Sequence, residues 1–387
     1  MELQTFGLIN WSILGIYLVG NIVLGAVLSK KVTSADDFFV GQRNIPWWAI
    51  GVSVVASYVS ALSFLGGPAW SYTEGLSVIA IHLNYPIVIF IVIAFFLPFF
   101  FNSGVASIYD YLERRFGATS RSVIAIIFLV SQCLTSAAIL YATALVLEFI
   151  TGMPVVYAII IITVIALIYT IMGGLAAVIW TDVVQAFILL VGALIITVSL
   201  INNLSLPLGE TLALLKAEGK TDPLNFSFDS TQVSTVWTGV IAMALFHITV
   251  YGANQMMVQR TLASKNIGDA KKSFLMMGYL AIFIYFLFFL LGILFYSYYS
   301  GREFENGNII ILQFASTLAI PGLMGIIAAA VIAASMSSLD SAFNSMSTVT
   351  TIDFYQKYVK TNASQEHYLL VSRLFTVFWA LAIIIPA

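Results

Sequence analysis

Long apolar runs separated by short polar segments dominate the pattern of this chain. A helix that crosses a bilayer needs about 20 mostly apolar residues, and ten runs meet this measure. They lie at residues 7–28, 46–70, 77–101, 122–149, 154–174, 178–201, 236–258, 273–299, 321–347 and 368–387. Transmembrane strands would instead appear as short segments of alternating polarity. The pattern therefore predicts an all-α polytopic membrane protein.

Two of these runs contain interruptions. Run 46–70 holds "GVSVVASYVSALSFLGGPAW", in which serines precede Pro68, and run 236–258 holds "FHITVYGAN", which ends at Asn254. Each opens a set of five runs, if one further run completes the second set. Interrupted helices at matching positions in two halves are typical of transporters built from inverted repeats. The alternative is that the glycines only permit close helix packing.

Small and hydroxyl residues recur along run 321–347. Ala334, Ser337, Ser338 and Ser341 fall at i, i+3, i+4 and i+7, which places them on one helical face. Serine hydroxyls are oxygen ligands that suit a hard cation. The alternative is a packing face on which each hydroxyl bonds to the preceding turn of its own helix.

Acidic residues within the runs favour the cation interpretation. Asp182 and Asp340 lie well inside their runs, and a buried carboxylate needs a cation or a proton. Glu148 and Asp353 lie near run ends, where we expect them to reach the membrane interface.

Two of the three histidines also lie inside the runs. His82 falls in run 77–101 and His247 in the interrupted run 236–258. A core histidine is often only a packing residue bonded to a neighbour. Because both histidines lie on runs that would line a central cavity, we expect them to contribute to a binding site.

Composition and charge narrow the class of protein. The chain is 60% hydrophobic and only 9% charged, whereas soluble domains are about 25% charged. Its net charge of −2 leaves no basic surface for nucleic acid, and a single cysteine, Cys133, excludes an internal disulfide. The residues before the first run include Glu2 and no basic residue. We therefore expect that run to be retained rather than cleaved as a signal peptide.

The basic residues alternate in phase with the runs. Twelve follow odd-numbered runs and three follow even-numbered runs. The first set is Lys30, Lys31, Arg43, Arg114, Arg115, Arg121, Arg260, Lys265, Lys271, Lys272, Lys357 and Lys360; the second is Lys216, Lys220 and Arg302. By the positive-inside rule the first set is cytoplasmic, which predicts an N-terminus outside the cell membrane.

Five segments together resemble the sodium:solute symporter family. They are "SADDFFVGQRNIPWWAIGVSVVASYVSALSF", "YDYLERRFG", "YTIMGGLAAVIWTDVVQ", "YGANQMMVQRTLASKN" and "ASMSSLDSAFNSMSTVTTIDFY". The resemblance implies a single transporter domain with a LeuT-like 5+5 inverted repeat. Residues 1–45 would form an extra N-terminal helix and loop, 46–201 the first repeat and 236–387 the second. The last core helix would be missing, and because Ala387 ends an apolar run we expect the natural protein to continue.

The same resemblance implies sodium ligands. The family's main site uses carbonyls at the break of the first core helix and a carbonyl with two hydroxyls on the eighth. The matching residues are Ala56, Val59, Ala334, Ser337 and Ser338. Some members bind a second sodium deeper, and its matching residues are Asp182, Ser337, Asp340 and Ser341. The chain departs from the family at Asp340, where relatives have a hydroxyl.

The substrate pocket of relatives draws on the first, second, third and sixth core helices. The matching residues are Ser60, Ser63, His82, Thr135, His247, Val250 and Tyr251. Sugar transporters carry other residues at 82, 247 and 250, and sialic acid symporters carry an arginine where this chain reads "SQCLTSAAI". The sequences of these motifs resemble those of the family branch that carries monocarboxylates, iodide and vitamins.

The resemblance therefore implies a sodium-coupled symporter, not an enzyme, that imports a small organic anion such as a monocarboxylate. The alternatives are symport of sialic acid, a sugar or an amino acid, and a non-transporting sensor on the same fold. A channel would show a ring of like polar residues or a filter loop, and neither is evident. The expected partners are a small solute, sodium ions and the lipid bilayer, with the monomer as the functional unit.

Overall fold

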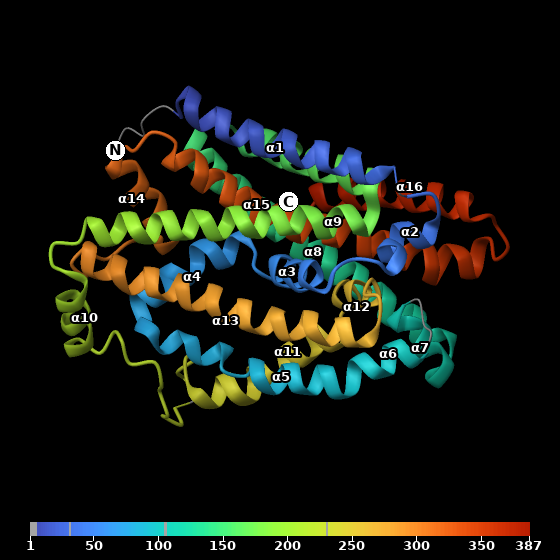
Figure 1. The fold of residues 1–387 in the computed structure, drawn as a ribbon, viewed down its shortest axis with the longest axis horizontal. Helices are drawn as coiled ribbons and strands as arrows, with labels where there is room; N and C mark the ends of the chain where they lie inside the picture. The colour runs from blue at the N-terminus through green and yellow to red at the C-terminus, as the bar shows by residue number, and fades with distance from the viewer. Residues whose placement is uncertain (1–5, 31, 104–106, 230) are drawn as a thin grey trace.

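The computed structural model describes residues 6–30, 32–103, 107–229 and 231–387, and most of these residues are helical (Figure 1). Glu2 and Lys31 lie outside this part. The elements are α1 (Leu8–Ser29), α2 (Ala35–Val40), η1 (Gly41–Arg43), α3 (Trp47–Tyr58), α4 (Ala61–Glu74), η2 (Gly75–His82), α5 (Tyr85–Ile91), η3 (Val92–Phe96), α6 (Leu97–Ser103), α7 (Ile108–Phe116), α8 (Ala118–Thr151), α9 (Val155–Asn202), α10 (Leu208–Ala217), η4 (Thr238–Ala242), α11 (Met243–Ile248), η5 (Thr249–Ala253), α12 (Gln255–Leu262), α13 (Ile267–Tyr298), η6 (Gly307–Ile309), α14 (Ile310–Leu318), α15 (Leu323–Val349), η7 (Thr350–Val359) and α16 (Gln365–Ile384).

Within the described ranges, seven helical segments are long and apolar enough to cross a bilayer. The bent pair Thr238–Ala253 and Gln255–Leu262 makes an eighth. The ten predicted runs do not map one to one onto these segments. Segment Ala61–Ser103 contains the end of run 46–70 and all of run 77–101, and α9 contains two runs. The polytopic all-α class is confirmed, while the 5+5 repeat and its boundaries stay predictions.

Helix α9 reverses direction at Gly174, where the backbone takes the left-handed values φ 54° and ψ −148°. Gln185 Nε2 lies 3.4 Å from the Tyr169 hydroxyl. Sixteen residues of straight helix would separate these positions by about 24 Å, so the chain must turn back between them. The two runs predicted within α9 are therefore two packed stretches on either side of Gly174.

Both interrupted runs are broken in the structure. The first breaks between α3 and α4, where Val59 and Ser60 are extended. Pro68, whose neighbourhood suggested the interruption, lies inside α4 instead. The second breaks at Asn254, which is also extended, and the flanking helices are bent by 50°.

Helix α15 forms the centre of the molecule. It packs against α9, α8, α1, α16 and α3, while α13 packs against α3 and α4 on the neighbouring side (Figure 1). Its segment is the most buried of the candidate spans, which explains its many alanines and serines, because small side chains let surrounding helices approach closely.

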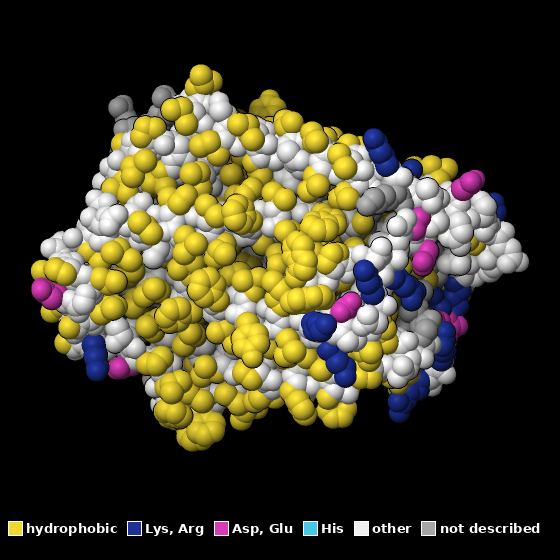
Figure 2. Space-filling model, in the orientation of Figure 1, with side chains coloured by type: hydrophobic (Ala, Val, Ile, Leu, Met, Phe, Trp, Pro, Cys, Tyr) yellow, Lys and Arg dark blue, Asp and Glu magenta, His cyan; other side chains and the backbone are white. Residues whose placement is uncertain are grey.

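Basic side chains gather at one end of the molecule. Figure 2 shows most visible Lys and Arg side chains near α2, α7 and α12, and few at the opposite end near α10. Apolar side chains cover the region between the two ends. This distribution fits the charge alternation of the sequence. Among the eleven described residues of the first set, Arg121 and Arg260 are buried rather than exposed in loops.

Candidate functional site

The break after α3 faces the hydroxyl face of α15 across a small cavity. The last carbonyls of a helix have no partner within that helix, so the end of α3 presents free oxygens here. The cavity measures about 10 Å³, which is room for one water-sized particle. Four of the five predicted main-site residues line it: Ala56, Val59, Ala334 and Ser337.

The fifth predicted residue, Ser338, lies next to this group on α15. Its hydroxyl bonds to the Ser57 carbonyl at 3.2 Å and to the Ala334 carbonyl at 3.4 Å. Ser338 thereby links α15 directly to the last turn of α3. The residues predicted for the main sodium site therefore lie together around one small cavity, whose other lining side chains are mostly apolar.

The residues predicted for a second cation also lie together. The Ser337 hydroxyl donates to Asp182 Oδ1 at 2.5 Å, which places Asp182 directly beside the main-site cavity. Asp340 accepts from the Tyr169 hydroxyl at 2.6 Å and from the Ser341 hydroxyl at 3.1 Å. Both carboxylates are fully buried.

A buried arginine, predicted to lie in a loop, joins this cluster. Arg260 Nη2 lies 3.2 Å from Asp182 Oδ2 and also bonds to the Ser341 hydroxyl, while Nε donates to Ser53 at 2.8 Å. Only 1% of Arg260 is exposed. The prediction of a cytoplasmic loop position was wrong because α12 continues from the break at Asn254 into the core, with all eight of its residues buried.

The charges of this buried cluster do not cancel when both acids are ionised. Asp182 and Asp340 together carry two negative charges, and Arg260 supplies one positive charge. A buried uncompensated charge is costly. The cluster can therefore hold one further monovalent cation with Arg260 in place.

Three of the predicted substrate residues meet in an aromatic cluster. His82 stacks on Tyr285 with ring centres 3.7 Å apart and lies 5.9 Å from His247. The ring centres of Tyr251 and His247 are 5.8 Å apart, and the hydroxyl oxygens of Tyr251 and Tyr85 are 3.2 Å apart and hydrogen-bonded. Tyr85 and Tyr285 were not anticipated, because a tyrosine in an apolar helix carries no sequence signal of its own.

The hydrogen bonds fix the state of His247. Asn84 donates both amide hydrogens, to the carbonyls of Ile81 and Gly239. Its Oδ1 therefore accepts from His247 Nδ1 at 2.7 Å, which leaves Nε2 to accept from the Tyr58 hydroxyl at 2.9 Å. Both ring nitrogens of His247 are thus engaged by the protein.

The remaining predicted substrate residues are less concentrated. Ser63 lies 3.5 Å from the Tyr285 hydroxyl, and Ser60 begins α4 at the break. Val250 is half-buried against the core. Thr135 is exposed on α8. The structure therefore gathers the histidines, Tyr251 and the serines near the two breaks and leaves Thr135 apart from the aromatic cluster.

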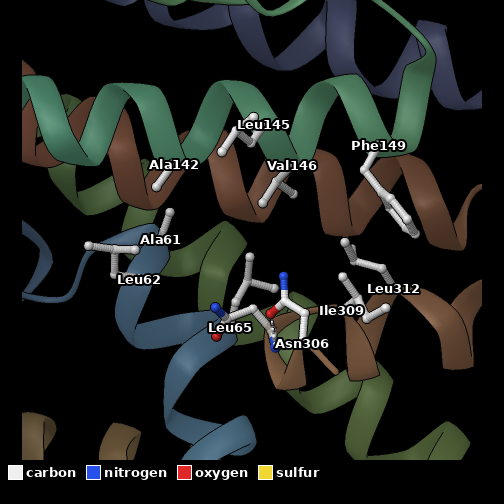
Figure 3. Close-up of a pocket in the computed structure, with 11 residues that line it drawn as sticks. Ala61, Leu62, Leu65, Ala142, Leu145, Val146, Phe149, Asn306, Ile309 and Leu312 are labelled. Carbon is white, nitrogen blue, oxygen red and sulfur yellow. Dashed lines mark hydrogen bonds between the residues drawn. The ribbon is translucent and has the colours of Figure 1, made fainter. Parts of the chain in front are cut away.

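A larger cavity begins at the start of α4. It measures about 320 Å³ and is lined by Ala61, Leu62, Leu65, Ala142, Leu145, Val146, Phe149, Asn306, Asn308, Ile309 and Leu312. Figure 3 shows the apolar side chains of α8 facing those of α4 and α14, with Asn306 beside Leu65. Because Ala61 directly follows Ser60, this cavity adjoins the break between α3 and α4.

The basic end of the molecule holds a second ionic group. Arg121 Nε lies 2.8 Å from Asp353 Oδ1 and Nη1 lies 2.6 Å from Glu113 Oε2, while Lys357 pairs with the same Glu113. Asp353 is fully buried, so the expectation that it reaches the membrane interface was wrong; its arginine partner makes burial tolerable. Glu148 is exposed.

Comparison with known proteins places the chain in a family. The model of the sodium:solute symporter family matches residues 38–387. The Sodium/sialic acid symporter SiaT of Proteus mirabilis is 32% identical over 97% of this chain and 77% of its own length. The Sodium/glucose cotransporter of Vibrio parahaemolyticus is 31% identical, with 95% and 73% covered, and the mouse Sodium-coupled monocarboxylate transporter 2 is 30% identical, with 86% and 55% covered.

A solved structure agrees with the sequence comparisons. A Na⁺-coupled sialic acid symporter in a substrate-bound, outward-open state superposes with a TM-score of 0.92 at 30% identity, covering 98% of this chain and 82% of the other. This similarity confirms the LeuT-like fold. The relatives named here are sodium-coupled transporters, so sodium is the coupling ion of this chain as well. The chain belongs to the sodium:solute symporter family.

Proposed function

We propose that this symporter imports a carboxylate-bearing organic solute together with sodium. The observation that carries the transport mechanism is the one-particle cavity where the break after α3 meets α15. An ion held there joins the end of a broken helix to the central helix, and its binding therefore favours one arrangement of the two. Ala56, Val59, Ala334, Ser337 and Ser338 would hold this ion.

A sialic acid is the leading candidate substrate. The relatives that transport sialic acids are 32% identical to this chain, against 28–30% for the monocarboxylate transporters. Sequence identity to known relatives therefore favours a sialic acid over the predicted monocarboxylate. Both substrate classes carry a carboxylate, whereas the glucose of the Vibrio relative does not.

His82 is the histidine that we assign to substrate. Its Nδ1 is buried and has no hydrogen-bond partner in the described part of the chain, whereas both nitrogens of His247 are engaged. A buried polar atom without a partner is costly, and a substrate oxygen would satisfy it. His247 would instead hold Tyr58 in position beside the break.

A small monocarboxylate remains the second candidate because of one feature of α8. Residue 135 is a threonine in a segment without arginine, and its side chain is exposed. A guanidinium binds a carboxylate through two parallel hydrogen bonds, and this segment offers none. The absence of an arginine here counts against the carboxylate contact that the family resemblance implies for sialic acid symporters, and so keeps the smaller solute as a candidate.

The second cation position would serve an anionic substrate. Moving one charge through 100 mV supplies about 2.3 kcal/mol, which is roughly a fifty-fold concentration ratio. One sodium with a monoanion moves no net charge and gains nothing from the potential. A second sodium between Asp182 and Asp340 would restore one net positive charge per cycle.

Uptake into proteoliposomes tests the function directly. Purified full chain is reconstituted, and radiolabelled sialic acid, lactate and glucose are offered with an inward sodium gradient or with potassium in its place. We expect sodium-dependent accumulation of sialic acid, or of lactate if the second candidate is correct. Accumulation of glucose alone would overturn the substrate class, and binding of a solute without any accumulation would identify a sensor.

One histidine variant tests the assignment within the aromatic cluster. His82→Phe keeps the ring stack but removes the free nitrogen, so we expect the KM for substrate to rise about tenfold or more, consistent with loss of a hydrogen bond to a charged group. In the same variant, the sodium concentration that gives half-maximal uptake should change less than twofold. An unchanged KM in His82→Phe would remove His82 from the substrate site.

A further inference from the structure

A glutamine on α9 faces the main sodium cavity from a side that neither α3 nor α15 occupies. Gln185 follows Asp182 by three residues, so the two lie on one face of their helix. It lines the same 10 Å³ cavity as Ala56 and Ser337, and only 1% of it is exposed. No assignment from the family resemblance included it.

The neighbouring hydrogen bonds determine how its amide is oriented. The Tyr169 hydroxyl has a single hydrogen, which it donates to Asp340 Oδ2 at 2.6 Å. Its oxygen can therefore only accept from Gln185, so the group 3.4 Å away must be Nε2. This leaves Gln185 Oε1 buried and without a hydrogen-bond partner among the described residues.

We infer that Gln185 supplies an additional oxygen ligand to the main sodium ion; this rests on the proposed sodium site. A carboxamide oxygen is a neutral hard ligand of the kind that sodium binds. It would add a contact from α9 to those from α3 and α15, so that one ion joins three helices. The lone pairs of this oxygen are available to an ion, whereas nine-tenths or more of buried polar groups are already paired within the protein.

The opposite end of the same amide connects this ion to the second carboxylate. Gln185 Nε2 bonds to Tyr169, and Tyr169 bonds to Asp340. When sodium draws Oε1 toward the cavity, the amide and the tyrosine hydroxyl move with it. The occupancy of the main site would thereby affect Asp340 through Gln185 and Tyr169, in addition to the contact that Ser337 makes with Asp182.

Sodium binding measured by thermal unfolding tests the inference. Purified full-length protein is titrated with NaCl at constant ionic strength, with choline replacing sodium, and the sodium concentration for half-maximal stabilisation is recorded. We expect Gln185→Leu to raise this concentration at least tenfold. Gln185→Asn, whose shorter side chain withdraws the oxygen, should raise it about threefold. Gln313→Leu on α14 is the matched control and should change it less than twofold.

A purely structural glutamine would give a different result. Its replacement would lower the unfolding temperature without sodium but leave the half-maximal sodium concentration within twofold of the parent, and this outcome overturns the inference. If Gln185→Leu does not fold, Gln185→Asn decides by the same measurement. Ser338→Ala distinguishes a failure of this inference from a failure of the proposed main site. If this variant also leaves sodium binding unchanged, the proposed main site is itself wrong.

Discussion

At the scale of single residues, Arg260 changes the interpretation of the cation cluster most. Its guanidinium bonds to Asp182, Ser53 and Ser341, all of which lie in or beside the predicted second site. The resemblance to the family named only acids and hydroxyls there. The guanidinium of Arg260 therefore already occupies part of the space, and an ionised Asp340 would carry the charge that a further cation is proposed to balance.

Replacing Arg260 by glutamine should destabilise the protein strongly. Removing one partner of a buried ion pair costs about 3–5 kcal/mol, because Asp182 would lose its charged partner. Sodium should restore part of this loss, since an ion that binds only the folded state stabilises it. Thermal unfolding of Arg260→Gln at low and high sodium measures both effects. Arg115→Gln on the exposed face of α7 is the control and should change stability by less than about 0.5 kcal/mol.

Replacing Asp340 by serine should change the coupling ratio. Asp340→Ser gives this position the hydroxyl that the resemblance implies for relatives and removes the negative charge that Arg260 leaves uncompensated. We expect the number of sodium ions taken up per substrate molecule to fall by about one. Parallel ²²Na and substrate fluxes in proteoliposomes give this ratio. A ratio identical to that of the parent protein would make Asp340 a structural residue.

At the scale of elements, the breaks and reversals place the site. The break after α3 supplies carbonyls, and the break at Asn254 turns α12 inward so that its polar residues reach α15. The reversal at Gly174 brings Tyr169 and Gln185 together from opposite sides of the turn. Each of these irregularities contributes a residue to the cation cluster or its border.

The reversal of α9 should depend on Gly174. A Cβ at this position would meet the Phe38 carbonyl oxygen at 2.6 Å, and its φ of +54° disfavours other residues. We expect Gly174→Ala to lower stability by about 2 kcal/mol or more, whereas Gly15→Ala on α1, with nothing within 4 Å, should stabilise by up to about 1 kcal/mol. Thermal unfolding compares the two. Equal stability would mean that the turn tolerates a side chain.

The ionic contact between α7 and η7 should give a pH-dependent stability. Hydrogen bonds from Lys357 and then Arg121 hold the pKa of Glu113 below its usual range. A lowered folded-state pKa means that the stabilisation is present above the unfolded value of about 4.3 and is lost as the pH falls through the folded value.

Glu113→Gln should therefore unfold more easily than the parent at pH 7, by at most about 1 kcal/mol because the side chain is partly exposed. The difference should begin to shrink below the unfolded-state pKa of about 4.3 and disappear only once the pH is below the lowered folded-state pKa of Glu113. Unfolding midpoints from pH 7 to pH 3 in guanidinium chloride measure it. A difference that stays constant over this range would exclude the carboxylate charge as its cause.

At the scale of the whole molecule, one glutamine joins three elements at the basic end. Gln259 Nε2 on α12 lies 2.7 Å from the Phe39 carbonyl of α2, and 2.9 Å from both Asn344 Oδ1 and Thr348 Oγ1 of α15. Alternating access requires one part of the transporter to move against another. These bonds hold α12 against α2 and α15, so we expect them to break when this end opens.

Gln259→Leu should therefore make α12 more mobile. An Nε2 group has two hydrogens, and two hydrogen bonds contribute about 2 kcal/mol, which corresponds to roughly thirty-fold faster opening. Hydrogen–deuterium exchange of residues 255–262, followed by mass spectrometry, measures this change. Gln313→Leu on α14 should leave exchange in this segment unaltered. Unchanged exchange in Gln259→Leu would show that packing alone holds α12.

The sequence by itself determined the class, the coupling ion and most of the cation cluster. Apolar runs predict membrane helices because the bilayer leaves backbone groups no other partner. The spacing of the α15 serines predicts a shared face because helical periodicity is local. Asp182 and Asp340 are conspicuous because acids are rare in apolar runs. These inferences need only the chain's local chemistry and its motifs.

Tertiary structure decided what the local pattern could not contain. Arg260 looked like a loop charge because its burial depends on the direction that α12 takes after Asn254. The sequence gives no sign of a role for Gln185, because the orientation of its amide depends on Tyr169, sixteen residues earlier. His82 and His247 differ in role only because Asn84 and Tyr58 surround one of them. Partners distant in sequence set each of these roles, and only the folded chain brings them together.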